Sequence, residues 1–248
     1  MNRDIIYVCL GTIENIVLSY GITAIDFFKS LTTVPEHLLL LTPVDYNELI
    51  DPHTGFNILS DPTDITNYFN DRKLTVRKWL DYQDESYLDE VTPYEVAELL
   101  YLGHTATYLH SPFYYKLGNH FVYLDLPNGM NKTYYRYLER FYHVFNFAVL
   151  RHIRERKAEQ SFWLRVRQSH LRPLSVDVFN QLRSLMAQGA VFVFSQMRTQ
   201  QGVLQIPIYH IAHLVVNDEH WNSEDAIPAG ILSFSLRTDK WNLSLVKA

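Results

Sequence analysis

Cysteine and glycine are both scarce in this chain, and their scarcity narrows its possible chemistry. The single cysteine, Cys9, cannot form an internal disulfide, and its apolar surroundings favour a small core residue over a nucleophile. With only nine glycines, few loops could let a phosphate group approach the backbone closely. There is no phosphate loop, dinucleotide-binding glycine fingerprint, Gly-x-Ser-x-Gly elbow or His-Glu-x-x-His motif. We therefore expect no cofactor.

Long hydrophobic runs are also missing. The most apolar stretch, residues 141–150, is far shorter than the roughly 18 residues that a membrane span requires, and His143 and Asn146 interrupt it. The first four residues, Met1 to Asp4, lack the features of a secretory signal peptide. These absences predict a soluble, cytoplasmic protein with no membrane partner.

The composition is that of a globular protein rich in tyrosine. Hydrophobic residues make up 47% of the 248 positions and charged residues 20%, which excludes a disordered chain. There are 17 tyrosines and 14 phenylalanines. Tyrosine buries its ring and keeps a polar tip, so this excess fits either wide amphipathic surfaces or a lined cleft.

The net charge of −5 conceals an uneven distribution. Residues 1–100 contain 17 acidic and 6 basic side chains, whereas residues 151–172 contain 7 basic and 2 acidic ones. Two patches of opposite sign can dock on each other within one chain or between subunits. The basic side chains are Arg151, Arg154, Arg156, Lys157, Arg165, Arg167 and Arg172.

The fold prediction is organised around residues 119–160. The aromatic and β-branched residues 120–126 predict a strand, and Pro127-Asn128-Gly129 predicts a tight turn. From Tyr134 onward apolar residues recur at helical spacing, which predicts one long helix. Because that helix is apolar around most of its circumference, we expect it to lie at the centre of the protein.

The remaining elements differ between the two ends of the chain. Before the long helix, the pattern predicts an opening strand over 4–10 and helices over 23–31, 66–82 and 92–102, while residues 37–41 fit a buried strand or a helix end. After it, helical segments over 161–172 and 176–188 precede strands over 191–194, 203–216, 231–236 and 241–246. Short connections between these strands favour an antiparallel meander.

These elements predict an α+β fold. A mostly helical N-terminal portion would surround the long central helix, and a four-stranded antiparallel sheet would form the C-terminal end. The chain would be a single α+β domain over residues 1–248. Residues 1–172 would be mainly helical, and residues 173–248 would hold a helix plus an antiparallel β meander.

Two groups of residues are candidates for a small-molecule site. Glu139 and His143 are four residues apart on the predicted helix, so the carboxylate could orient the imidazole for work as a general base. A solvated helix edge is the simpler interpretation of the same pair. A ligand-binding loop is predicted from a cluster of histidines and tyrosines, namely His104, Tyr108, His110, Tyr114, Tyr115 and His120.

We expect no metal site. His210 and His213 would point to opposite faces of a strand, and no standard ligand spacing is present among the histidines. The acidic loop with Asp51, Asp61 and Asp64 lacks the Asp-x-Asp spacing of a calcium loop.

Three functions remain open. The missing motifs, the aromatic excess and the charge asymmetry favour a protein that acts by association, as a homo-oligomer or with another protein. The alternative is a small-molecule enzyme or binding protein whose pocket contains His104, His110, His120, Glu139 and His143. A weaker alternative is nucleic-acid binding through residues 151–172, where Phe162 and Trp163 accompany the basic side chains.

Overall fold

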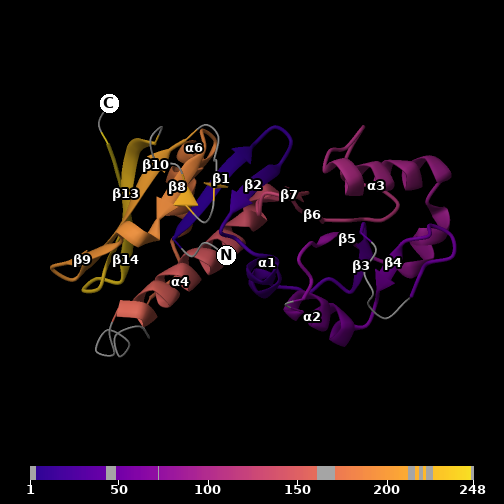
Figure 1. Cartoon of the computed structure of the whole chain (residues 1–248), viewed down its shortest axis with the longest axis horizontal. Coiled ribbons are helices and arrows are strands. Elements are labelled where there is room, and N and C mark those ends of the chain that lie inside the picture. Colours follow the sequence, from indigo (N-terminus) through magenta and orange to yellow (C-terminus); the bar gives the residue numbers. More distant parts are fainter. Residues whose placement is uncertain are drawn as a thin grey trace.

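A computed structural model shows that one antiparallel sheet of twelve strands runs through the whole length of the protein (Figure 1). The structure describes residues 4–42, 49–71, 73–160, 171–211, 216–217, 220–221 and 226–246, and for residues 157–160, 216–217 and 220–221 it describes the backbone only. Beside the large sheet, β11 (Val216–Asn217) and β12 (His220–Trp221) form a separate pair.

The strand order joins the N-terminal and C-terminal halves of the chain in one sheet. Strand β1 lies near the middle of the sheet, where it pairs with β2 on one side and with β8 on the other, so that Ile5 faces Val193. Strand β9 (Arg198–Gln200) pairs with β10 at the side of this row. The order along the sheet is β14 (Lys240–Leu245), β13 (Ile227–Ser235), β10 (Val203–His210), β8 (Ala190–Val193), β1 (Ile5–Gly11), β2 (Ile16–Tyr20), β7 (Asn131–Tyr135), β6 (Phe121–Asp125), β5 (Lys78–Tyr82), β3 (His37–Leu40) and β4 (Asn57–Leu59).

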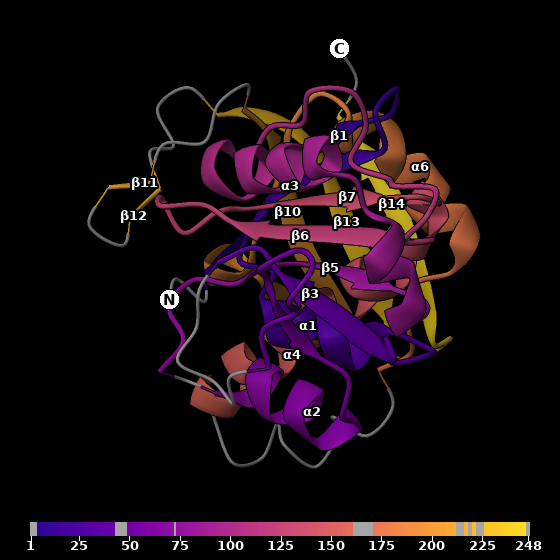
Figure 2. The same cartoon turned by 90° about the vertical axis from the view of Figure 1, so that its right-hand side faces the viewer.

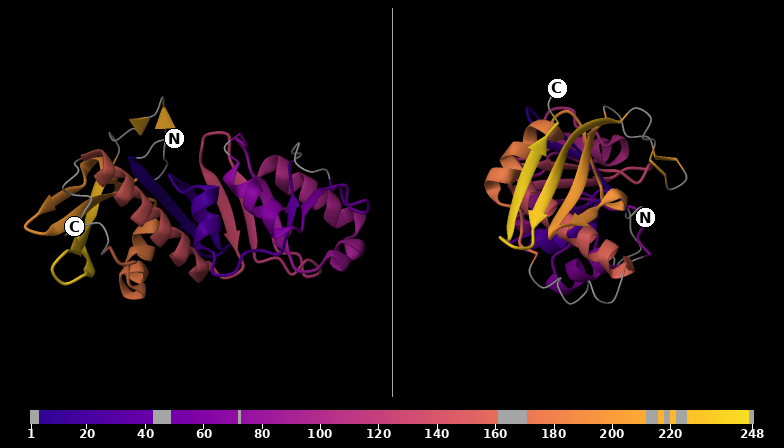
Figure 3. Two further views of the ribbon diagram at one scale, coloured as in Figure 1. Left: turned by 90° about the horizontal axis from the view of Figure 1, so that it is seen from below. Right: turned by 90° about the vertical axis from the view of Figure 1, so that its left-hand side faces the viewer.

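Helices cover both faces of the sheet. The largest core cluster lies on one face, where side chains from α1 (Ala24–Ser30), α2 (Pro62–Asn70), α4 (Phe141–Gln160) and α6 (Val176–Met186) are buried against the strands. The opposite face carries α3 (Pro93–Thr105) and the short 3-10 helix η1 (Glu85–Glu90), with a second core cluster beneath them. Figure 2 shows α3 on one side of the sheet and α1 and α2 on the other, and Figure 3 shows α4 running along the sheet.

The predicted mainly helical N-terminal portion is wrong, because strands and helices alternate along the whole chain. The helix expected over 66–82 is in fact α2, which ends at Asn70, followed by strand β5. In β5, Trp79 belongs to the core on one face of the sheet and Leu80 to the core on the other. A strand buried on both faces shows no alternation of apolar and polar residues, so its sequence resembles part of a helix.

The expected long helix from Tyr134 is also wrong at its start. After the turn at Asn128-Gly129 the chain returns as strand β7, which pairs with β6 and places Tyr135 opposite Phe121. A short 3-10 helix, η2 (Leu138–Arg140), follows, and α4 begins only at Phe141. The later part of the prediction is confirmed, since α4 is a helix of 20 residues with Phe141 and Phe145 fully buried.

The four C-terminal strands are confirmed as β8, β10, β13 and β14, but they do not form a sheet of their own. The pairing of β8 with β1 joins them to the strands of the N-terminal half. The expected helix over 161–172 lies mostly outside the described residues, because 161–170 are not described.

Candidate functional site

A cavity of about 610 Å³ lies where β5 ends and β6 begins, and we call it the strand-end cavity. Its walls are the segment 30–36 that follows α1, residues 81–83 at the end of β5, residues 120–121 at the start of β6, and Arg140 and His143 at the junction of η2 and α4. Two helices and two strands from distant parts of the sequence therefore meet around it.

Asp81 is the buried acid of the strand-end cavity. Its carboxylate accepts hydrogen bonds from the backbone N–H groups of His120, at 2.9 and 3.1 Å, and of Phe121, at 2.6 Å. These bonds fasten the start of β6 to the end of β5. They also satisfy a carboxylate whose side chain is only 9% exposed, as a buried charge requires.

His120 lies next to this carboxylate. Its Nδ1 atom is 3.4 Å from Asp81 Oδ2, within ion-pair distance when the ring is protonated. The imidazole is 29% exposed and lies near the rings of Phe121 and Tyr137, with centroid distances of 6.4 and 6.3 Å. The histidine therefore combines a fixed position with access to the cavity.

Arg140 supplies the positive charge at the cavity wall. Its guanidinium lies over the ring of Phe121 at 5.3 Å and over the ring of Tyr137 at 5.6 Å. His143 follows three residues later, on the same side of the helical turn, and is exposed. Burial raises the pKa of Tyr82, in the same wall, to about 12, so this phenol stays neutral at physiological pH.

The predicted pair of Glu139 and His143 does not form. Both side chains are exposed, no ion pair within 4.0 Å joins these two described residues, and Glu139 does not line the cavity. The acid beside a cavity histidine is instead Asp81, which sequence analysis missed. An aspartate between the apolar residues Leu80 and Tyr82 was the available signal, since acids within such runs need a partner.

The predicted histidine and tyrosine cluster does not converge on one site. Of its six members only His120 lines the strand-end cavity. On the other face of the sheet, Tyr108 packs against Tyr134 and Tyr114 is buried in the core beneath α3. His104 is exposed on α3, and Tyr115 is 95% exposed.

His110 belongs to a separate polar cluster on α3. Its Nδ1 atom contacts the carboxylate of Glu98, a buried residue, and lies 3.1 Å from the hydroxyl of Tyr94. Burial, together with Glu98, raises the pKa of Tyr114. Neither the strand-end cavity nor the second cavity described below is lined by these residues, so we do not place the candidate site there.

Three members of the basic segment contact acidic side chains of the same chain. Arg151 binds Asp26, Arg156 lies 3.5 Å from Asp4, and Arg172 lies 3.8 Å from Asp239. Two of these partners, Asp4 and Asp26, belong to the acidic residues 1–100, whereas Asp239 lies near the C-terminal end of the sheet.

The other members of the basic segment are less informative. Arg154 is exposed on α4, and the side chains of Lys157, Arg165 and Arg167 lie outside the described residues.

The candidate metal ligands stay apart. His210 Nδ1 lies 3.3 Å from the carbonyl oxygen of Gly189, and the side chains of His213 and His220 are outside the described residues. Asp51 binds Thr54 within its own turn, and Asp61 caps α2. Among the described side chains, no group of three His, Cys, Asp or Glu could hold a metal ion.

A second cavity, of about 400 Å³, lies at the other end of α1 beside Asp125. Burial raises the pKa of this carboxyl, although the Arg77 backbone N–H and the Tyr123 hydroxyl donate hydrogen bonds to it. Arg77 in turn donates to the carbonyl oxygens of Tyr68, at 3.3 Å, and Leu74, at 2.9 Å. The charged groups here are occupied in holding β5 and β6, so we favour the strand-end cavity.

None of the described helices is both long enough and apolar enough to cross a lipid bilayer. Comparison of the chain with protein-family models, with curated proteins and with solved structures found no match.

Proposed function

We propose that this protein binds a small polar molecule in the strand-end cavity and that His120 exchanges a proton with it. The pairing of Asp81 with His120 at the cavity wall carries this proposal. The cavity volume of about 610 Å³ falls within the range of small-molecule sites, roughly 300–1,000 Å³.

The chemistry follows from the position of the carboxylate. Asp81 lies next to Nδ1, so it favours a proton on that nitrogen and leaves Nε2 to accept one from a ligand. After the transfer, the same carboxylate stabilises the imidazolium cation. The backbone N–H groups of His120 and Phe121 hold the Asp81 carboxylate in place beside the ring.

Hydrolysis of p-nitrophenyl acetate tests this proposal, because an accessible and oriented imidazole can accept the proton of the water molecule that attacks this activated ester. We expect His120→Asn to lower the rate by about tenfold or more, in the range of general-base contributions. His110→Asn is the matched control, since that histidine also contacts a carboxylate but lies outside the cavity. Equal rates for the wild type and both variants, with unchanged circular dichroism, would refute the role of His120.

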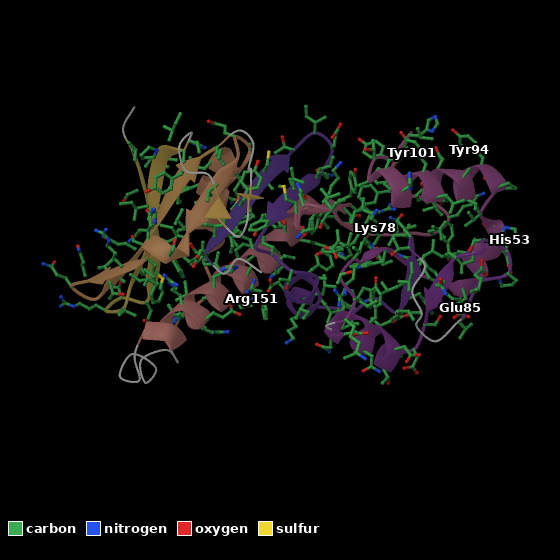
Figure 4. All side chains as sticks on the ribbon, in the orientation of Figure 1. His53, Lys78, Glu85, Tyr94, Tyr101 and Arg151 are labelled. Carbon is green, nitrogen blue, oxygen red and sulfur yellow. The ribbon has the colours of Figure 1, made fainter. Side chains whose placement is uncertain are left out.

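A second candidate function is self-association through the outer face of α3. Three apolar side chains of α3 are exposed: Tyr94 is 59% exposed, Leu100 56% and Tyr101 40%. Figure 4 labels Tyr94 and Tyr101 along α3. The opposite side of the same helix buries Leu99 and Leu102, so α3 is apolar on both sides, which is typical of a helix covered by a partner.

We propose a second copy of this chain as that partner. Two α3 helices in antiparallel arrangement would bring the exposed Tyr94, Leu100 and Tyr101 of one copy against those of the other, as in a two-fold symmetric dimer. A cytoplasmic location remains part of this proposal, since the single cysteine forms no internal disulfide.

A further inference from the structure

We infer that the ligand of the strand-end cavity carries an oxyanion, a carboxylate or a phosphate, and that Arg140 anchors it. This inference rests on the proposed binding function, but it concerns a different residue and a different property of the ligand. The observation behind it is an exposed arginine whose guanidinium contacts two aromatic rings and which forms no ion pair with any described carboxylate.

The aromatic contacts hold the guanidinium of Arg140 in place. Phe121 and Tyr137 lie on it at 5.3 and 5.6 Å, so its planar group has limited freedom. Among the described residues, no carboxylate lies within 4.0 Å of this guanidinium and no acceptor receives a hydrogen bond from it. A guanidinium held by its faces keeps its N–H groups available at its edges, where a carboxylate or phosphate binds with two parallel hydrogen bonds.

Two other arginines, Arg151 and Arg136, have structural roles and differ from Arg140 in their hydrogen bonds. Arg151 binds both oxygens of Asp26 and also donates to the Gly21 carbonyl oxygen. Arg136 donates to the carbonyl oxygen of Asn119 at 2.7 Å. Each of these arginines is tied to the protein by hydrogen bonds, whereas Arg140 has ring contacts and an open cavity beside it.

Two further side chains, His143 and Glu36, shape the ligand. His143, one turn along α4, lies at the same wall and can donate a hydrogen bond to the same oxyanion. Glu36 lines the other wall, on the segment after α1, and repels a second negative charge. The ligand should therefore be acidic at one end only, with hydroxyl or other neutral polar groups facing Thr32 and Thr33.

Titrations followed by NMR of the full chain test this inference, with inorganic phosphate, glycolate and ethylene glycol as probes. We expect phosphate or glycolate to shift amide signals of residues 30–36, 120–121 and 140–143, whereas ethylene glycol, which has no charge, should bind much more weakly. Arg140→Gln should weaken anion binding by about tenfold or more, because a charge-assisted pair of hydrogen bonds is lost. Arg140→Lys should retain part of the affinity, since it keeps the charge without the planar geometry.

The controls separate this inference from the proton-transfer proposal. Arg154→Gln removes an exposed arginine of α4 outside the cavity and should leave binding unchanged. Glu36→Gln should strengthen phosphate binding several-fold by removing the repulsion. If neither anion binds the wild type, or if Arg140→Gln binds as tightly as Arg154→Gln, the anchor is refuted. The ester assay on His120→Asn has its own outcome, so either proposal can fail without the other.

Discussion

Arg151 of α4 donates hydrogen bonds to both carboxylate oxygens of Asp26 in α1. Its Nε lies 2.6 Å from Oδ1 and its Nη2 lies 2.7 Å from Oδ2. Asp26 is completely buried, and the same carboxylate accepts the backbone N–H of Thr23 to close the capping box of α1. Figure 4 labels Arg151 on α4, next to α1. This pair fixes the relative position of α1 and α4, whose ends form two walls of the strand-end cavity.

Removing one partner of this pair should destabilise the fold strongly. We expect Asp26→Ala to lower the free energy of unfolding by about 3–5 kcal/mol, because the charge of Arg151 loses its buried counterion and α1 loses its cap. Urea unfolding followed by circular dichroism measures the change. Glu155→Gln, which alters the more exposed contact of the same arginine, should cost less than about 1 kcal/mol. Equal losses for both variants would contradict this account.

Asp81 should have a structural effect beyond its proposed role beside His120. Asp81→Ala leaves the backbone N–H groups of His120 and Phe121 without their acceptor, so we expect a loss of about 1–3 kcal/mol in unfolding free energy. Asp81→Asn keeps an acceptor and should lose less. Asp89→Asn, at an exposed position, provides the baseline. If Asp81→Ala unfolds at the same urea concentration as the Asp89 variant, these hydrogen bonds do not stabilise the sheet.

The buried carboxyl of Asp125 should make the protein more stable at mildly acidic pH. Burial raises its pKa above the ordinary 3.8, so the folded state binds this proton more tightly than the unfolded state does. The contribution of Asp125 to the free energy of unfolding is therefore largest below about pH 4. It is lost as the pH rises through the raised pKa of the folded state. We expect Asp125→Asn to lose less stability than the wild type as the pH rises above about 4. Parallel stability curves for the two proteins would be inconsistent with a raised pKa.

Two glycines with similar backbone angles should respond differently to alanine. Gly189 has φ +83°, and an added Cβ would lie 2.3 Å from the carbonyl oxygen of Ile211, whereas Gly202 has φ +76° with nothing within 4 Å. Gly202→Ala should cost only the backbone strain, about 1 kcal/mol. Gly189→Ala adds a clash with main chain and should cost more than about 2 kcal/mol. Thermal unfolding compares the two, and similar midpoints would show that the turn after α6 can move aside.

The exposed face of α3 predicts a concentration-dependent dimer. Size-exclusion chromatography with light scattering should show twice the monomer mass at high protein concentration, and Leu100→Glu should restore the monomer by burying a charge at the contact. Leu245→Glu is the control, because Leu245 is 58% exposed on β14, far along the sheet from α3. A wild type that stays monomeric at every concentration, or a dimer that survives Leu100→Glu, would exclude this surface.

Features that depend on a few neighbouring residues were predictable from the sequence. The helices predicted over 92–102 and 176–188 are α3 and α6, and short local patterns start both of them: Thr92 and Glu95 form a capping box, and Ser175 caps α6. Asn128-Gly129 marks a real turn, with φ +74° at the glycine. In β10 the burial alternates along most of the strand, so its period identified it.

The tertiary structure alone decided how these pieces pair and where a site forms. Tyr134 and Tyr135 face opposite cores, and this double burial, which no local pattern reports, makes their segment a strand rather than a helix. Asp81 and His120 meet although 39 residues separate them, because β5 and β6 pair and bring their ends together. Local preferences act over a few residues and specify caps, turns and periods. The partner of each strand, and therefore the cavity at the strand ends, depends on contacts between distant segments that exist only in the folded protein.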